Sequence, residues 1–198
     1  MLEKTLRTPY QYLFVNWAAS YLKDKIHPIS VTFFSIIFGI ISAICISFNF
    51  SMIAIILLLL SGYCDTLDGT IARMAKKQSD IGSVLDIMAD RVVEISIILG
   101  LYFNSSEIRA TSSLFMLSSI ILCLCAFLVV GIFTSKEHAN NKSFFYSQGL
   151  MERAETFIFF ILMILIPNYF NFLAYLFSVL VFITAILHIY RFIKWQLI

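Results

Sequence analysis

Residues 64–94 read CDTLDGTIARMAKKQSDIGSVLDIMADRVVE. Carboxylates recur in this stretch, inside or beside segments apolar enough to span a bilayer, among them Asp65, Asp68, Asp86, Asp90 and Glu94. An ionised carboxylate in such surroundings costs several kcal/mol unless another group compensates its charge. The sequence therefore predicts a site for metal ions.

The spacing of these acids places them on two helix faces. Residues three or four apart share a face of a helix, so Asp65 and Asp68 are expected to lie together near the end of one helix. On the next helix Asp86, Asp90 and Glu94 recur every four residues, a stripe that drifts slowly around a helix of about 3.6 residues per turn. The two sets should face each other across a helical hairpin. Because they offer hard oxygen ligands without His or Cys, they suit Mg²⁺ or Mn²⁺.

The composition is that of a polytopic membrane protein. Apolar side chains make up 60% and charged ones 13% of the 198 residues, which is far from a soluble globular composition. All four cysteines fall in apolar segments and are interpreted as packing residues. We expect one membrane domain over residues 1–198, with an interfacial segment at 1–28 and a transmembrane bundle at 29–198.

Apolar runs predict six transmembrane helices, at about 31–48, 52–73, 81–103, 111–133, 149–166 and 170–190. The fold class is therefore an all-α integral membrane protein with six transmembrane helices and an N-terminal amphipathic juxtamembrane helix. That first helix is expected to begin at Thr8-Pro9, and its aromatic and apolar residues recur at helical intervals: Tyr10, Leu13, Phe14, Trp17 and Tyr21. The alternative is a juxtamembrane segment without a function. No secretory signal peptide is predicted.

The distribution of Lys and Arg predicts the orientation. With a cytoplasmic N-terminus, every basic residue except Arg109 lies at or near the cytoplasmic face. Both chain ends and the acidic stretch should then face the cytoplasm. The longest polar loop, 134–147, lies on the same side and is interpreted as a solvated connector or, alternatively, as a substrate entry.

The acidic stretch resembles the signature of the CDP-alcohol phosphotransferases, D-x-x-D-G-x-x-A-R-x8-G-x3-D-x3-D. Eight residues fill its fixed positions: Asp65, Asp68, Gly69, Ala72, Arg73, Gly82, Asp86 and Asp90. The resemblance implies an enzyme of phospholipid biosynthesis that transfers a phosphatidyl group from CDP-diacylglycerol to a small alcohol and releases CMP. It further implies two Mg²⁺ or Mn²⁺ ions, a homodimer, contact with membrane lipids, and a place in the bacterial inner membrane. No nucleic-acid partner is expected.

The resemblance also assigns roles. It implies that Asp65, Asp68 and Asp86 bind metal, and that Asp90 is the general base that deprotonates the acceptor and also touches metal. It implies a CDP-lipid site made of Pro28, Thr32, Thr66, Gly69, Ala72, Arg73, Ser79 and Gly82. Pro28 and Thr32 match a P-N-x-x-T stretch that many members of the family carry before the first transmembrane helix, and Ile29 replaces its Asn. Helix packing through small residues is the alternative for the two glycines.

The acceptor is less defined by the sequence. Residues 149–156 read GLMERAET and resemble G-L-x-E-R-x-E-R of relatives that use inositol phosphate, except that Thr156 replaces the final Arg. Arg153 is the candidate for gripping an acceptor phosphate, and glycerol 3-phosphate and inositol phosphate are the candidate acceptors. Glu94 either orients Arg91, binds a ligand, or lines the acceptor pocket.

Two other function classes compete with this interpretation. A transporter would also place carboxylates in the membrane, but near the midplane and with inverted repeats, whereas these acids gather at one face. A non-catalytic scaffold of the same family would be expected to lose a motif aspartate, and all four are present.

Overall fold

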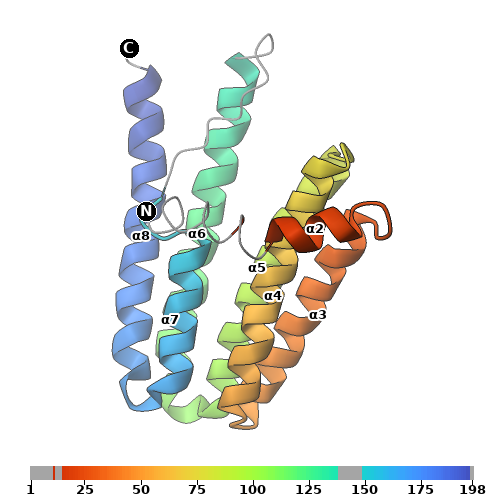
Figure 1. Ribbon diagram of the computed structural model, residues 1–198. Helices are drawn as coiled ribbons and strands as arrows, with labels where there is room; N and C mark the ends of the chain where they lie inside the picture. Colours follow the sequence, from red (N-terminus) through yellow and green to blue (C-terminus); the bar gives the residue numbers. More distant parts are fainter. Residues whose placement is uncertain (1–10, 12–14, 138–148, 197–198) are drawn as a thin grey trace. The chain divides into compact units, whose positions relative to one another are not determined.

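The computed structural model describes residue 11, residues 15–137 and residues 149–196 (Figure 1). These residues form helices and turns, and no β-strand occurs among them. They divide into two compact units, here called the N-terminal unit, up to Arg109, and the C-terminal unit, from Ala110 onward. The division falls in the first turn of α6 (Ser106–Glu137).

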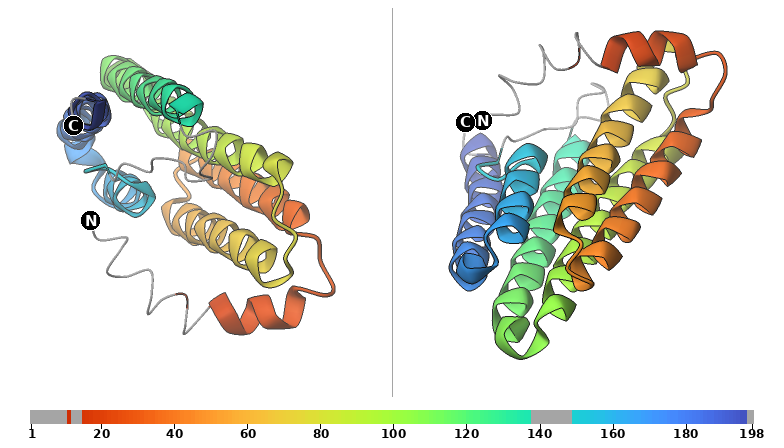
Figure 2. Two further views of the ribbon diagram at one scale, coloured as in Figure 1. Left: turned by 90° about the horizontal axis from the view of Figure 1, so that it is seen from above. Right: turned by 60° about the horizontal axis from the view of Figure 1, so that its bottom comes forward.

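Within the described residues, the N-terminal unit contains four whole helices, of which α3 (Pro28–Ser47) is the central one. The others are α2 (Asn16–Leu22), α4 (Ser51–Met74) and α5 (Asp80–Asn104). Helix α3 packs against both α4 and α5, and α2 lies across the end of α4 (Figure 2). A Cβ on Gly100 of α5 would overlap the backbone of Ala43, so this glycine permits the close approach of α5 to α3.

Local signals in the sequence end and begin these helices. Pro28 occupies the first turn of α3, where its missing N–H costs nothing. Asn49 and Lys76 have left-handed backbones, with φ of 66° and 52°, and follow the ends of α3 and α4. Ser79 caps α5, because its hydroxyl accepts a hydrogen bond of 3.1 Å from the Gly82 N–H.

The end of α5 away from the acidic stretch is closed by polar side chains. Buried Arg109 donates from Nη1 to the Leu101 carbonyl at 2.9 Å. Asn104 donates to the Ile46 carbonyl at 3.0 Å and to Asn49 Oδ1 at 2.7 Å. Carbonyls at the ends of α3 and α5 thereby obtain the partners that hydrocarbon would not supply.

The C-terminal unit consists of most of α6 with α7 (Arg153–Leu165), a 3₁₀ turn (Pro167–Tyr169) and α8 (Phe170–Gln196). Helices α7 and α8 pack against each other through aromatic rings, among them Phe160 and Phe177. Ser112 of α6 donates to Asn171 of α8 at 2.7 Å.

Four stretches of the described helices are long and apolar enough to cross a membrane: Pro28–Ser47, Ser51–Met74, Ser106–Thr134 and Pro167–Gln196. Helices thus form in all six predicted regions, but six spans are not confirmed. Helix α5, with 25 residues, is long enough to cross a membrane, but it carries many charged side chains. Helix α7 has 13 residues, about 20 Å at 1.5 Å per residue, against about 30 Å of hydrocarbon.

Two predicted boundaries are corrected. The fifth helix begins at Arg153 and not at residue 149, because the Met151 N–H donates to Thr184 Oγ1 at 3.0 Å instead of joining a helix. Residues 134–137, expected in a loop, continue α6, and the rest of that loop lies outside the described residues.

The predicted N-terminal amphipathic helix is not confirmed. The described part is α2, which buries Val15 and Ala19 while Trp17 and Tyr21 are exposed. Thr8, Pro9, Tyr10, Leu13 and Phe14 lie outside the described residues. Pro28, placed at the end of the interfacial segment, instead begins α3.

Candidate active site

Three carboxylates from two helices meet in the N-terminal unit. Asp65 and Asp68 come from α4 and Asp86 comes from α5, and one ligand atom of each lies within 4.8 Å of the others. Asp68 is buried, Asp65 is half-buried and Asp86 is exposed. We call these residues the three-acid group. The helical hairpin therefore brings the two halves of the acidic stretch together.

The donor set of this group fits a hard divalent cation. All three ligands are carboxylate oxygens, the type that Mg²⁺ and Mn²⁺ prefer. Their spread of 4.8 Å is close to the roughly 4.2 Å that separates two oxygens on opposite sides of an Mg²⁺ ion. A cation would also relieve the mutual repulsion of three negative charges at this distance.

Asp90 is not a member of the three-acid group. It is half-buried on α5, four residues and about 6 Å along the helix axis from Asp86. It follows Asp86 on nearly the same face of the helix. Asp90 can therefore contact a ligand that is bound next to the three-acid group.

Thr32 reaches the group from α3. Its hydroxyl donates to Asp68 Oδ2 at 2.5 Å, and both side chains are buried. The resemblance placed Thr32 at the CDP-lipid. The contact with Asp68 was not predicted, because it depends on how α3 packs on α4.

The remaining motif residues of α4 lie on its last turns. Arg73 is exposed and donates to the Thr70 hydroxyl at 3.0 Å, while Thr66 donates to the Gly62 carbonyl at 2.9 Å. Thr70 was missed in the sequence, although its spacing of three residues from Arg73 is a helical contact distance. Ala72 is half-buried beside Arg73.

The two motif glycines have open surroundings. Among the described residues, a Cβ on Gly69 would come near only the Arg73 guanidinium, and a Cβ on Gly82 would meet only the Ser79 hydroxyl. Within this part of the chain neither Cβ would touch another helix, unlike one on Gly100. The geometry therefore disfavours helix packing as the reason for glycine at these two positions and leaves room for a ligand at the backbone.

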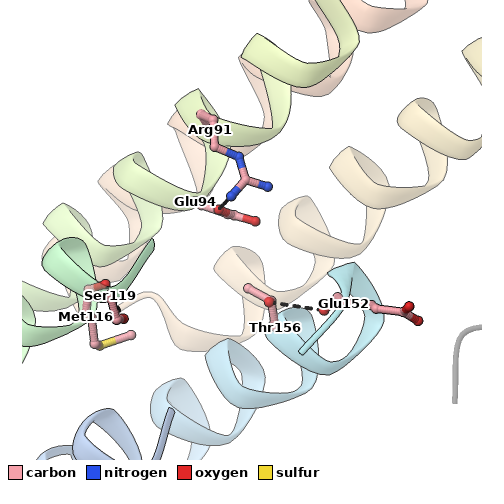
Figure 3. A network of polar contacts seen from close by, with 6 residues as sticks. All are labelled: Arg91, Glu94, Met116, Ser119, Glu152 and Thr156. Atoms are coloured by element: carbon pink, nitrogen blue, oxygen red, sulfur yellow. Dashed lines mark hydrogen bonds and ion pairs between the residues drawn. The ribbon is translucent and has the colours of Figure 1, made fainter. Parts of the chain in front are cut away.

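Glu94 forms an ion pair with Arg91. Arg91 Nη1 lies 2.7 Å from Glu94 Oε2 (Figure 3). The Glu94 side chain is 7% exposed and that of Arg91 is 26% exposed. Of the roles considered for Glu94, the orientation of Arg91 has direct geometric support.

The acceptor candidate belongs to the C-terminal unit. Arg153 is the first residue of α7, and its guanidinium lies 5.5 Å from the centre of the Phe157 ring. Thr156 donates to the Glu152 carbonyl at 3.2 Å (Figure 3), so the residue in place of the expected Arg serves the first turn of α7. The acceptor role of Arg153 stays a prediction.

Residues 25–191 match the family described as CDP-alcohol phosphatidyltransferase. The chain belongs to the CDP-alcohol phosphatidyltransferase family. The match includes the three-acid group, Asp90 and Arg153, and extends over both units. The resemblance read from the signature is thereby confirmed, and so is the class of enzyme.

This phosphatidyltransferase is similar to a protein of Escherichia coli and to a solved structure. It is 27% identical over 168 residues to the inner membrane protein YnjF of Escherichia coli, with 82% of this chain and 81% of that protein covered. Its fold matches the crystal structure of the Mycobacterium tuberculosis phosphatidylinositol phosphate synthase PgsA1 with CDP-DAG bound. That match has a TM-score of 0.68 and 18% identity and covers 90% of this chain and 93% of the other. The phosphatidyltransferase is a membrane protein by its apolar helices and its relatives.

Proposed function

We propose that this protein transfers a phosphatidyl group from CDP-diacylglycerol to a small, phosphorylated alcohol and releases CMP in a reaction that depends on a divalent cation. The observation that carries the proposal is the three-acid group, which occupies the signature positions of a CDP-alcohol phosphatidyltransferase. The synthase with a similar fold was solved with CDP-DAG bound, which supports this donor.

Asp65, Asp68 and Asp86 are the residues that would hold the cation, with Asp90 as a further ligand. When bound, two Mg²⁺ or Mn²⁺ ions would neutralise charge on the pyrophosphate oxygens of the donor. Together with Asp90, the three-acid group would offer enough oxygens for two ions that keep some of their water.

The reaction replaces a phosphoanhydride bond of the donor with a phosphate ester bond to the acceptor. The acceptor hydroxyl oxygen forms a bond to the phosphorus that carries the diacylglycerol, and the bond from that phosphorus to the bridging oxygen breaks. CMP leaves with the bridging oxygen, and the hydroxyl proton passes to the Asp90 carboxylate. The position of Asp90 beside the three-acid group suits this role as general base.

The donor nucleotide is proposed to lie along the last turns of α4 and the first turn of α5. Gly69 and Gly82 leave their backbones accessible there, and the exposed Arg73 guanidinium suits phosphate oxygens. The other proposed donor contacts are Pro28, Thr66, Ala72 and Ser79. Ser79 also caps α5, so it would join a ligand contact to the start of that helix.

The acceptor is proposed to be glycerol 3-phosphate or an inositol phosphate. Arg153 would bind its phosphate. Glu94, which forms an ion pair with Arg91 in the N-terminal unit, is a further candidate for the acceptor. Thr156 stands where relatives that use inositol phosphate have the final Arg of their motif. One cationic contact to the acceptor phosphate is therefore absent at this position, which favours an acceptor that needs fewer such contacts than inositol phosphate does in those relatives.

The proposed topology has six transmembrane helices, with α5 and α7 added to the four candidate spans, and a cytoplasmic active site in the bacterial inner membrane. Helix α5 has 25 residues, about 37 Å, which is enough to cross about 30 Å of hydrocarbon. A homodimer, implied by the resemblance, is part of this proposal.

The test is CMP release by the purified protein in detergent with CDP-diacylglycerol and Mn²⁺. Glycerol 3-phosphate, inositol phosphate, inositol and serine are offered in separate reactions. We expect release that requires one phosphorylated alcohol and stops when the cation is chelated. Release that is equal without any alcohol, or unaffected by chelation, would contradict the proposal.

A further inference from the structure

Hydroxyl side chains connect α3 to α4 at three levels. The hydrogen bonds are Ser42 Oγ to the Ala54 carbonyl (2.8 Å), Ser35 Oγ to the Ser61 carbonyl (2.9 Å), Ser61 Oγ to the Ser35 carbonyl (2.8 Å), and Thr32 Oγ1 to Asp68 Oδ2 (2.5 Å). The α4 partners, at positions 54, 61 and 68, are seven residues apart, or about two turns of helix. We call this set the hydroxyl ladder.

The hydroxyl ladder fixes the register of α4 on α3. Ser35, Ser42 and Ser61 are at most 1% exposed, and Thr32 is 6% exposed. A buried polar group that loses its partner in an apolar setting has a high cost in free energy. A shift of α4 by one residue, about 1.5 Å along the axis, would break all three levels at once.

The Thr32 level differs from the others because its acceptor is a carboxylate of the three-acid group. The other two levels end on backbone carbonyls or hydroxyls. Asp68 is only 4% exposed, and the bond occupies one lone pair of Oδ2, while a carboxylate has about four lone-pair positions on its two oxygens. Hydrogen bonds of this kind orient a metal-binding carboxylate.

The Thr32 hydroxyl has one proton to give. A second possible acceptor, the Pro28 carbonyl, lies at 3.4 Å, much further than Asp68 Oδ2. The shorter, charge-assisted bond is the stronger one. The proton of Thr32 therefore belongs to Asp68.

We infer that Thr32 is a positioning residue, which holds the Asp68 carboxylate in the orientation that a divalent cation needs. This assigns to Thr32 the metal centre and not the lipid donor, the role that the resemblance implied. The inference rests on the proposed function, because it takes the three-acid group to be a metal site.

The experiment measures Mn²⁺ affinity directly, from the electron paramagnetic resonance signal of free Mn²⁺, on purified protein in detergent without CDP-lipid. Thr32→Val keeps the shape and removes the hydroxyl. We expect its Mn²⁺ affinity to fall about 10- to 100-fold, with an unchanged KM for CDP-diacylglycerol at saturating Mn²⁺. Thr32→Ser keeps the hydroxyl and should bind Mn²⁺ like the wild type.

Ser42→Ala is the matched control, because it removes a buried hydrogen bond from the same ladder two levels away from Asp68. It should leave the Mn²⁺ affinity unchanged even where it lowers the melting temperature. Thr32→Ala provides a second hydroxyl-free variant in case Thr32→Val does not fold.

The possible failures can be told apart. If the wild type binds Mn²⁺ and releases CMP while both hydroxyl-free variants keep the Mn²⁺ affinity of the wild type, the role of Thr32 is overturned and the proposed function stands. A higher KM for CDP-diacylglycerol in those variants, with unchanged Mn²⁺ affinity, would return Thr32 to the donor site. A wild type that binds no Mn²⁺ would overturn the proposed function and this inference with it.

Discussion

Single side chains in the acidic site differ in how firmly the protein holds them. Asp68 is buried and accepts the Thr32 hydrogen bond, while Asp86 is exposed. Asp90 stands one helical turn beyond the three-acid group. This arrangement separates the three residues that would do most to hold a cation from Asp90, which would touch a cation and also move a proton.

Asp90→Asn tests that separation. The amide keeps the shape of the side chain but cannot accept the acceptor proton, so CMP release should fall at least about 100-fold, the lower end of what a general base contributes. Mn²⁺ affinity should change far less, because the three-acid group stays intact. Turnover and Mn²⁺ affinity are measured on the same preparation. CMP release at the wild-type rate would remove Asp90 as the base.

Glu94→Gln tests the ion pair with Arg91. The change leaves the half-buried guanidinium without its anionic partner at 2.7 Å, and we expect a loss of about 2 kcal/mol of stability. Thermal unfolding in detergent reports this as a lower melting temperature. The double variant Arg91→Gln with Glu94→Gln is the control, and it should recover part of the loss because no buried charge remains. A single variant as stable as the wild type would show that the pair contributes little.

The sequence predicted the composition of this site better than its contacts. Spacings of three and four residues were sufficient to place Asp65 with Asp68 and to bring Asp86 near them. The bond from Thr32 to Asp68 could not be predicted, since it depends on the register of two helices that are 36 residues apart at this contact. The recurrence of small hydroxyl residues along α3 was the available signal, and it is weak in a chain with many serines.

Among the helices, glycine serves two different purposes. Gly100 of α5 lies against the backbone of Ala43 in α3, while Gly69 of α4 has only the Arg73 side chain nearby. A side chain at position 100 meets rigid backbone. One at position 69 enters the space proposed for the donor nucleotide.

A pair of alanine variants distinguishes these purposes. Gly100→Ala should lower the melting temperature, because overpacking against backbone costs about 1–3 kcal/mol. Gly69→Ala should keep the melting temperature, since Ala is the better helix former, and should raise the KM for CDP-diacylglycerol. Melting curves and donor titrations on both proteins provide the comparison. A donor KM that is unchanged in Gly69→Ala would move the nucleotide away from this turn of α4.

The helices themselves were largely predictable. The apolar runs predicted the bounds of α3, α4 and α5 to within a few residues. Pro28 at the start of α3 and Ser79 before α5 are local signals that agree with these bounds. The start of α7 was missed by four residues, because Thr184 of a distant helix takes the Met151 N–H. Such competition between a local and a distant partner does not appear in the periodicity of a segment.

For the molecule as a whole, helix length and the placement of charges bear on how the chain crosses the membrane. Four stretches are long and apolar enough to cross a membrane, and α5 joins two turns that must lie on opposite sides if it also crosses. Its first turn follows Lys76 and Lys77, and its last turn is closed by buried Arg109. The positive-inside rule places the lysine end in the cytoplasm, and burial explains how Arg109 is accommodated at the other end.

Cysteine labelling of intact cells tests this topology. In a background without the four natural cysteines, Lys77→Cys and Glu107→Cys place one exposed thiol at each end of α5. A membrane-impermeant maleimide should label position 107 in intact cells and position 77 only after the membrane is opened. These two positions are separated by α5, about 37 Å long. Labelling of both positions from one side would mean that α5 does not cross, and labelling of position 77 alone would place the acidic site outside the cytoplasm.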